Sequence, residues 1–295
     1  MEQNVITAVL LPVALGVIML GLGLSLKIED FKRVIVYPKA VAIGLACQML
    51  ILPAACLGIA HAFDLPPELA VGLMLLAASP GGATANLFSH LAKGDVALNI
   101  TLTAVNSVLS LITLPLIVNF SLEHFMGEGK SIPLQFGKVI QVVAIVLVPV
   151  FIGMAIRSKK PSVAERLEKP VKILSAVFLL LVIGSAIANE RDKLGTFFKA
   201  VGPACLAFNL ASLFIGYVVP RVFRVEKRQA VAIGMEIGIH NGTLAIAIAS
   251  SPQLLNNPMM AIPAAIYSLI MFFTAGAFGW FSARNSERSE RQAEA

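Results

Sequence analysis

The chain alternates long apolar runs with short polar loops. Nine of these runs reach the length of about 20 residues that spans a bilayer core of roughly 30 Å as a helix. The predicted spans cover residues 5–26, 36–60, 68–91, 95–119, 136–157, 171–189, 199–220, 228–250 and 259–283. We therefore predict an all-α polytopic membrane protein of nine transmembrane helices, with no soluble domain between them.

The eighth predicted span differs from the others because it carries a charge at its centre. Its sequence, AVAIGMEIGIHNGTLAIAIA, places Glu236, His240 and Asn241 among glycines. A charged side chain at the bilayer centre costs about 2.5 to 3.5 kcal/mol on insertion scales, so an intramembrane acid indicates a functional site with a compensating cation. The Asn241-Gly242 pair favours a break in the helix. We predict a discontinuous helix over 228–250 whose opened backbone coordinates an ion.

The third predicted span, over 68–91, contains a second break. Proline in the middle of a helix lacks a donor and clashes with the previous turn, and the segment SPGGATAN supplies the break residues Pro80, Gly81 and Gly82. Small polar side chains lie beside this break, at Ser79, Thr84 and Asn86. A simple proline kink is the alternative. Because irregular backbone at membrane depth is tolerated only inside protein or beside a water-filled cavity, two breaks predict a polar site near the midplane.

Two further spans carry polar side chains that could face these breaks. Asn99, Thr103 and Asn106 follow one another at spacings of four and three residues, which places them on one face of a helix. Gln48 is a single polar residue in the second span. Hydrogen bonding between helices is the alternative role for all four.

The distribution of charge predicts the orientation. The net charge is +6, and most Lys and Arg residues lie in the loops after spans 1, 3, 5 and 7 and in the tail, which is the positive-inside pattern and not the mark of a nucleic-acid partner. We predict a multi-pass protein of the inner (plasma) membrane, with the N-terminus outside and the C-terminus in the cytoplasm.

No Lys or Arg precedes the first span, so we expect a retained helix and not a cleaved signal peptide. The tail over 284–295 is expected to be disordered.

The two halves of the chain show weak internal similarity. Spans 6, 7 and 8 resemble spans 1, 2 and 3 in order, and an offset of 160 residues lays Gly81 and Gly82 over Asn241 and Gly242. The repeats are separated by an odd number of spans and insert with opposite orientation. This is the inverted-repeat layout of secondary transporters.

These motifs resemble a known family, the bile acid:sodium symporters and their bacterial relatives. The resemblance rests on SPGGATAN followed by GDVALN, on GLACQ upstream and on EIGIHNG in the penultimate span. It implies a core domain with two crossing discontinuous helices and a separate panel domain, in the nine-helix form of the fold. The expected division is panel helix 1 at 1–30, a first core half at 36–120, panel helices at 136–190, a second core half at 199–283 and a cytoplasmic tail at 284–295.

The resemblance also implies two sodium sites. The first would use Asn86, Asn99, Thr103 and Glu236, and the second would use Gln48, Glu236, His240 and backbone carbonyls near Ile237 and Ile239. The chain departs from the family pattern at Ala85, where a serine ligand is found, at His240, where glutamine is usual, and at Met271 and Phe272, where some relatives have a polar pair. These departures leave the number of coupled sodium ions and the identity of the substrate open.

Charge balance indicates the class of substrate. One carboxylate with two sodium ions leaves a charge of about +1, and the amino ends of two half-helices, each equivalent to about +0.5, add to it. An organic anion is then favoured beside the crossing, near Ala83, Thr84, Asn241, Gly242 and Thr243. We predict a sodium-coupled symporter of an organic anion, either bile-acid-like or a small carboxylate such as pantoate, working by alternating access as a monomer in the lipid bilayer. Sodium is its coupling ion, and we expect no other cofactor and no enzymatic activity.

Two alternatives stay open. The first is a proton-coupled carrier or exchanger of the same fold that uses Glu236 and His240 as a relay. The second, from a different class, is an intramembrane metal enzyme that uses the same two side chains as ligands.

Overall fold

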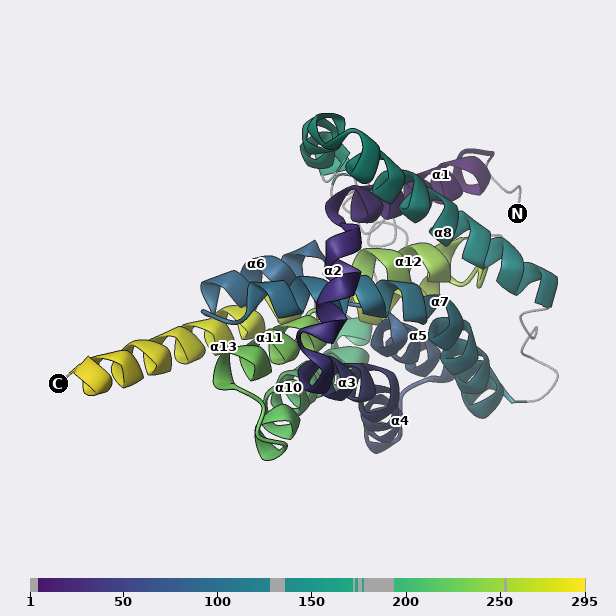
Figure 1. Ribbon diagram of the computed structural model, residues 1–295. Coiled ribbons are helices and arrows are strands. Elements are labelled where there is room, and N and C mark those ends of the chain that lie inside the picture. Colours follow the sequence, from purple (N-terminus) through teal and green to yellow (C-terminus); the bar gives the residue numbers. More distant parts are fainter. Residues whose placement is uncertain are drawn as a thin grey trace.

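The computed structural model describes residues 5–127, 136–171, 173–174, 177, 194–251 and 254–294. Within these residues the chain is helical and forms no strand, apart from one isolated backbone bridge (Figure 1). The elements in chain order are α1 (Val5–Ser25), α2 (Ile28–Lys32), η1 (Arg33–Ile35), α3 (Pro38–Ala46), η2 (Cys47–Ile51), α4 (Leu52–Ala62), α5 (Pro67–Ala78), α6 (Ala83–Leu91), α7 (Val96–Met126), α8 (Phe136–Lys159), α10 (Leu194–Val222), α11 (Lys227–Gly238), α12 (Gly242–Ser250), η3 (Pro258–Ala261) and α13 (Ile262–Glu294).

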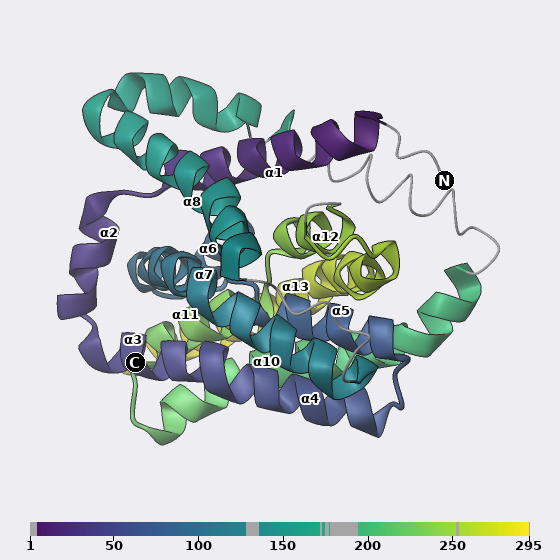
Figure 2. The same cartoon turned by 90° about the vertical axis from the view of Figure 1, so that its right-hand side faces the viewer.

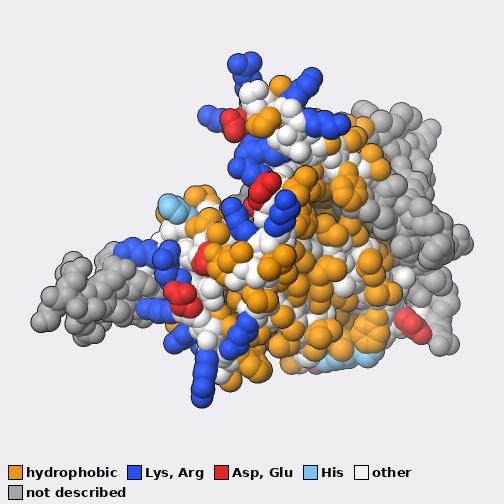
Figure 3. Space-filling model, in the orientation of Figure 1, with side chains coloured by type: hydrophobic (Ala, Val, Ile, Leu, Met, Phe, Trp, Pro, Cys, Tyr) orange, Lys and Arg blue, Asp and Glu red, His pale blue; other side chains and the backbone are white. Residues whose placement is uncertain are grey.

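Four helical stretches of the described chain are long and apolar enough to cross a membrane: Pro38–Ala62, Val96–Met126, Phe197–Val222 and Pro258–Arg284. Large apolar side chains on them face outward, among them Ile112, Phe214 and Phe273, which are 66%, 65% and 80% exposed. Figure 3 shows hydrophobic side chains over the middle of the molecule, with Lys and Arg gathered toward one side. Exposed apolar surfaces of this extent on long apolar helices require a lipid environment. The protein is therefore a multi-pass membrane protein.

Of the other predicted spans, those over 68–91 and 228–250 correspond to interrupted helices. α1 and α8 occupy the predicted spans over 5–26 and 136–157. Most of the predicted span over 171–189 lies outside the described residues. The count of nine spans accordingly stays a prediction.

α1 and α8 pack closely along one side of the molecule, and α2 leads from α1 to the other helices (Figures 1 and 2). Glycine permits this packing. A Cβ atom added at Gly153 of α8 would lie 2.6 Å from the carbonyl oxygen of Leu20, and one at Gly23 of α1 would meet the backbone of Val150. The two backbones thus touch where they cross.

The second predicted span is one continuous helical stretch with a local change of winding. α3 passes into α4 through a π-helical turn, η2, which contains Gln48. Pro53 lies in the first turn of α4 and lacks the N–H that would bond to the preceding turn, so the backbone there widens. The π turn places the Gln48 side chain in the buried interior.

Both helices expected to be discontinuous are interrupted in the structure. The segment Ser79–Gly82 separates α5 from α6, and Ile239–Asn241 separates α11 from α12. α5 and α11 are buried along almost their whole length. The freed backbone groups of both breaks therefore lie inside protein, as irregular backbone within a membrane requires.

The C-terminal tail differs from the expectation of disorder. α13 continues without interruption to Glu294. The tail contains no Pro or Gly that would end a helix, and its Ala, Arg, Glu and Gln residues are good helix formers. The prediction of a disordered tail was wrong for this reason.

Candidate functional site

The two helix breaks lie against each other. Gly81 and His240 form an antiparallel backbone bridge, and the backbone N–H of Asn241 donates to the carbonyl of Pro80 at 2.8 Å. The side-chain Oδ1 of Asn241 accepts from the N–H of Leu244 at 3.0 Å and so caps α12. The crossing is held by backbone pairing between segments about 160 residues apart in the chain.

Side chains from neighbouring elements hydrogen-bond to the carbonyls at the end of α5. Nε2 of Gln48 donates to the carbonyls of Ala77 and Ser79, both at 3.1 Å. Nδ1 of His240 lies 3.1 Å from the same Ser79 carbonyl, so this nitrogen carries the proton. The last carbonyls of a helix lack intrahelical partners, and these two side chains supply partners for α5.

The end of α11 is supported in a similar way by residues that the sequence analysis did not identify. The carbonyl of Gly238 accepts from Nδ2 of Asn209 and from the hydroxyl of Tyr267, both at 2.9 Å. Thr274 in turn donates to Oδ1 of Asn209. Asn209 is a polar residue in a span that resembles the one containing Gln48, and this was the signal available in the sequence.

Glu236 lies in the interior beside the crossing and is fully buried. Its Oε2 accepts from Oγ1 of Thr103 at 2.6 Å, and its Oε1 accepts from Nδ2 of Asn106 at 3.4 Å. The carboxylate also lies against the backbone of Gly81, where an added Cβ atom would come within 2.5 Å of Oε1. Among the described residues, no Lys, Arg or His side chain forms an ion pair with Glu236. A buried carboxylate without a cationic partner is costly, so the site favours a cation from outside the chain.

Four buried amide oxygens near the crossing have no hydrogen-bond partner among the described residues. In three of these amides the NH₂ group is already committed: that of Gln48 to Ala77 and Ser79, that of Asn99 to the carbonyl of Ala232 at 2.7 Å, and that of Asn106 to Glu236. Each such amide therefore presents its oxygen to the interior. Buried polar atoms are normally satisfied, so a group of open acceptors indicates a missing donor or cation. The open oxygens are Gln48 Oε1, Asn86 Oδ1, Asn99 Oδ1 and Asn106 Oδ1.

The residues predicted as sodium ligands are thus brought together only in part by direct contacts. Thr103 touches Glu236. Gln48 and His240 share the carbonyl of Ser79. Asn106, which was not in the predicted ligand set, contacts Glu236 directly. Its position one turn beyond Thr103 on the polar face of the predicted span was the available signal.

The backbone carbonyls predicted as ligands belong to the end of α11. Ile237 is in its last turn, and Ile239 is the first residue of the break. Both residues are buried. Carbonyls at a helix C-terminus have no intrahelical partner and carry a partial negative charge, which suits a cation.

His240 occupies an aromatic enclosure. Its ring stacks on Phe208 at 5.5 Å with an interplanar angle of 15°, and it meets the ring of Tyr267 at 5.5 Å and 60°. Nε2 of His240 is buried without a hydrogen-bond partner among the described residues. The imidazole and Glu236 make their hydrogen bonds to different groups, so no direct link joins them as a relay would need.

The residues predicted to contact substrate form the first turns of α6 and α12. Thr84 and Thr243 are each partly buried at the second position of their helix, and Gly242 begins α12. The side chain of Ala83 lies outside the described residues. Both helices begin at the crossing, so their unpaired N–H groups provide two partly positive ends at one place.

Two residues of α13 identified as departures from the family pattern take different positions. Met271 is buried, whereas Phe272 is 46% exposed and its ring lies 6.1 Å from that of Phe88. Neither side chain offers a polar group to the crossing.

A small cavity adjoins the crossing among the described residues. A cavity of about 20 Å³ lies between the α1–α8 pair and the crossing, and Pro80 lines it together with residues of α1, α7, α8 and α12, among them Met19, Ser107 and Val150. This volume is smaller than any organic anion. Movement of α1 and α8 relative to the crossing would be needed to admit one.

A site of the zinc type is not present among the described residues. No group of three or more His, Cys, Asp or Glu side chains lies close enough there to hold a metal ion. The buried His and Cys side chains among the described residues, Cys47, Cys56, Cys205 and His240, make no such cluster.

The comparisons with known proteins agree on one family. The family model described as Sodium Bile acid symporter family matches residues 12–197. A Bacillus subtilis protein named "Uncharacterized sodium-dependent transporter YocS" is 26% identical over 256 residues, which are 86% of this chain and 77% of that protein.

Relatives from plants and animals share less of their length with this chain. The Arabidopsis thaliana "Probable sodium/metabolite cotransporter BASS1, chloroplastic" is 24% identical over 257 residues, 87% of this chain and 62% of that protein. The human "P3 protein" is 28% identical over 252 residues, 84% of this chain and 51% of that protein. Two of these three relatives are named as sodium-dependent transporters or cotransporters.

Proposed function

Because this chain belongs to the Sodium Bile acid symporter family, we propose that it carries an organic anion across a membrane together with sodium. The observation that carries the proposal is the arrangement around Glu236. A buried carboxylate has no cationic partner among the described residues, and buried amide oxygens beside the crossing are left open. A cation bound there would satisfy both.

Sodium suits this set of atoms. It is a hard cation, and carboxylate, amide, hydroxyl and carbonyl oxygens are the ligands that hard cations prefer. We assign a first site to Asn86, Asn99, Thr103 and Glu236, to which the contact with Asn106 adds a fifth candidate. The 2.6 Å hydrogen bond from Thr103 orients the carboxylate while a lone pair of the hydroxyl stays available.

A second sodium site would use a different set of ligands. We assign it to Gln48, Glu236 and the carbonyls of Ile237 and Ile239, with His240 alongside. Gln48 presents an open Oε1, whereas the Nδ1 of His240 is used by the carbonyl of Ser79 and only its Nε2 remains. Nitrogen is a poorer ligand than oxygen for a hard cation, so this second site is the weaker of the two.

Sodium binding prepares the site for an anion. The amino ends of α6 and α12 meet at the crossing, and each contributes about half a positive charge. With sodium neutralising Glu236, a carboxylate or sulfonate is favoured beside Thr84, Asn241, Gly242 and Thr243. Without sodium, the charge of Glu236 opposes it.

Transport would proceed by alternating access. We propose that α1 and α8, with the remainder of 136–190, form the panel domain, and that 36–120 and 199–283 form a core of two inverted halves. The cavity of about 20 Å³ between them is too small for substrate, so this conformation is a closed one. Relative movement of panel and core would open it to one side or the other.

The orientation follows from charge. We propose a protein of the inner (plasma) membrane with the N-terminus outside and the C-terminus in the cytoplasm, because Lys and Arg gather on the side of α2 and the loop before α11. Cysteine labelling at each end of the chain in intact cells would test it.

The experiment that tests the function is a thermal-shift screen of organic anions. Bile acid conjugates, pantoate-like hydroxy acids and keto acids are each added to the purified protein in sodium buffer and in potassium buffer. Linkage requires a true substrate to raise the unfolding temperature more when sodium is present. A set of anions that stabilises the protein equally in both buffers would contradict sodium coupling.

A further inference from the structure

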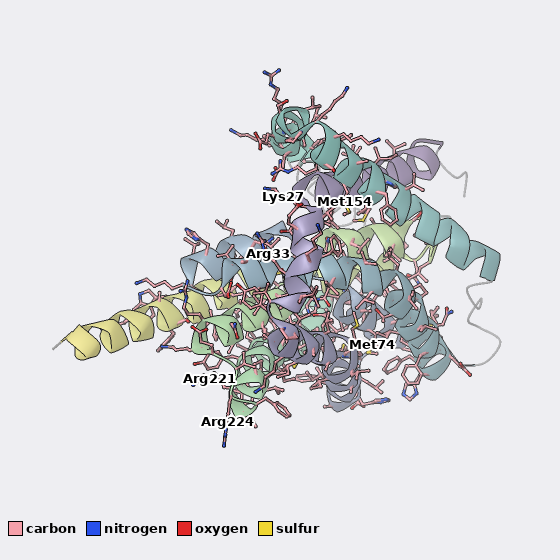
Figure 4. All side chains as sticks on the ribbon, in the orientation of Figure 1. Lys27, Arg33, Met74, Met154, Arg221 and Arg224 are labelled. Atoms are coloured by element: carbon pink, nitrogen blue, oxygen red, sulfur yellow. The ribbon has the colours of Figure 1, made fainter. Side chains whose placement is uncertain are left out.

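A cavity of about 270 Å³ lies away from the crossing, where the α1–α2 junction faces the last turn of α8 and the helical residues that follow it. Lys27 and Glu29 line one wall, and Arg157, Ser158 and Glu165 line the other. Figure 4 shows Lys27 and Met154, which also lines the cavity, close together at this junction. Neither sodium nor the anion of the proposed transport needs this space.

Arg157 is held in the cavity wall and forms ion pairs with two carboxylates, neither of which it meets at hydrogen-bond distance. Its side chain is 13% exposed, and its nearest acidic atoms are those of Glu165 at 3.8 Å and Glu168 at 3.7 Å. Both distances exceed that of a hydrogen bond. Since a guanidinium has five N–H donors, Arg157 keeps donors for the oxygen atoms of a ligand. Lys27, which is exposed, adds a second ammonium donor at the opposite wall.

The charged side chains that line the cavity balance. Lys27 and Arg157 are positive, and Glu29 and Glu165 are negative. A simple anion would meet two carboxylates, and a simple cation would meet two basic groups. The cavity therefore selects a ligand with one negative and one positive group, since like charges in contact oppose any other choice.

The position of the cavity identifies the source of such a ligand. Val148 and Ile152 lie one turn apart on α8 and are 53% and 50% exposed, so this face of the helix is open to lipid. Arg157 comes after them in the last turns of α8, about 8 Å beyond Ile152 at the rise of a helix. This is the depth at which phospholipid headgroups lie, and where basic side chains commonly meet them.

We propose that this cavity binds the headgroup of a zwitterionic aminophospholipid. The phosphate accepts from Arg157 and Lys27, and the primary ammonium donates to Glu29 and Glu165. The bound headgroup ties the beginning of α2 to the end of α8. Because α2 leads from the α1–α8 pair to the other helices, a lipid here stabilises the segment across which the two parts of the molecule move.

Lipid binding can be measured on the purified full-length protein after delipidation in detergent. Palmitoyl-oleoyl phosphatidylethanolamine, phosphatidylcholine and phosphatidylglycerol are added one at a time, and bound lipid is counted by native mass spectrometry. We expect phosphatidylethanolamine to bind best. The choline headgroup has no N–H to donate to the carboxylates, and phosphatidylglycerol has no cation and adds a net negative charge. Equal binding of all three lipids, or a preference for phosphatidylglycerol, overturns the proposal.

Three variants assign the binding to this cavity. Arg157→Gln should weaken phosphatidylethanolamine binding about tenfold, as expected for the loss of a hydrogen bond to a charged group. Glu29→Gln alters an exposed side chain and should shift the preference from phosphatidylethanolamine toward phosphatidylglycerol. Arg224→Gln, at an exposed arginine far from Lys27 in Figure 4, should leave binding unchanged.

The outcomes are decisive even if Arg157→Gln does not fold. An unchanged lipid preference in Glu29→Gln overturns the proposal, because the ammonium is assigned to Glu29 together with Glu165 and the loss of one of the two carboxylates must weaken its binding. Loss of binding in Arg224→Gln equal to that in Arg157→Gln also overturns it, because the effect is then one of overall surface charge.

Discussion

Gln48 and Asn209 play the same part at two different helix ends. Nε2 of Gln48 donates to the carbonyl of Ala77, and Nδ2 of Asn209 donates to the carbonyl of Gly238, each to a residue 29 positions further along the chain. Ala77 precedes the break after α5, and Gly238 is the last residue of α11. A shared role at the same separation supports the inverted repeat that we propose from the sequence.

Gly81 and Glu236 lie so close that the site depends on the absence of a side chain. A Cβ atom at Gly81 would lie 2.5 Å from Oε1 of Glu236, whereas one at Gly82 would meet nothing within 4 Å. We expect Gly81→Ala to displace the carboxylate and abolish sodium-dependent thermal stabilisation. Gly82→Ala is the matched control and should retain it. If Gly81→Ala keeps the same sodium-dependent thermal stabilisation as Gly82→Ala, the crossing tolerates a displaced carboxylate.

Glu236→Gln should abolish sodium-driven uptake while the protein still folds and inserts. The change keeps the shape of the side chain and removes the negative charge that the proposed sodium sites share. Uptake into proteoliposomes under an inward sodium gradient measures the effect, and size-exclusion chromatography checks the fold. Substrate accumulation by this variant at the wild-type level would refute the central role of Glu236.

Thr103→Val should weaken sodium binding. It preserves the shape of the side chain but removes both an oxygen and the hydrogen bond to Glu236. A loss of about 1.5 to 3 kcal/mol, typical of a hydrogen bond to a charged group, corresponds to an affinity roughly 10-fold to 150-fold lower.

The control for this variant is Thr101→Val on the same helix. Thr101 is also buried, but its hydroxyl donates to the carbonyl of Ala97 and not to the site. Sodium titrations of thermal stability compare the two. Similar sodium affinities in both variants would remove Thr103 from the proposed ligand set.

Tyr267→Phe should lower the free energy of unfolding modestly. The hydroxyl donates to the carbonyl of Gly238, and because Asn209 still donates to that carbonyl, we expect a loss at the lower end of about 0.5 to 1.5 kcal/mol. Tyr217→Phe changes a partly buried tyrosine that packs on Phe278 and serves as the control. Thermal unfolding in sodium-free buffer measures both, and a larger loss in Tyr217→Phe would contradict the assigned role of Tyr267.

His240→Gln should strengthen the second sodium site. Nitrogen is a poorer ligand than oxygen for a hard cation, and the imidazole presents only Nε2 because its Nδ1 donates to the carbonyl of Ser79. Sodium titrations of thermal stability compare the variant with the wild-type protein. Unchanged sodium affinity in His240→Gln would make His240 a packed side chain only.

Local features of the sequence were enough to place four of the membrane segments and the two breaks. Length and apolarity define a span, and the Pro-Gly-Gly and Asn-Gly segments mark the two interrupted ones, because these effects act within a few residues. Glu236 could be singled out for the same reason, since a charge in an apolar span is costly wherever it lies. The helical tail up to Glu294 shows the limit of this reasoning, because disorder was expected there although no Pro or Gly in it ends a helix.

Only the tertiary structure decided which groups meet. Thr103 and Asn106 reach Glu236 across 133 and 130 residues of chain, and Asn209 and Tyr267 share the carbonyl of Gly238 from two different helices. Periodicity assigns a residue to a face of its own helix, but it carries no information on which helix lies opposite. That choice follows from how whole helices pack. The assembled helices therefore decide which side chains contact Glu236. They also decide which amide atoms are hydrogen-bonded and which have no partner, and they form the cavity beside α8 with its balanced charges.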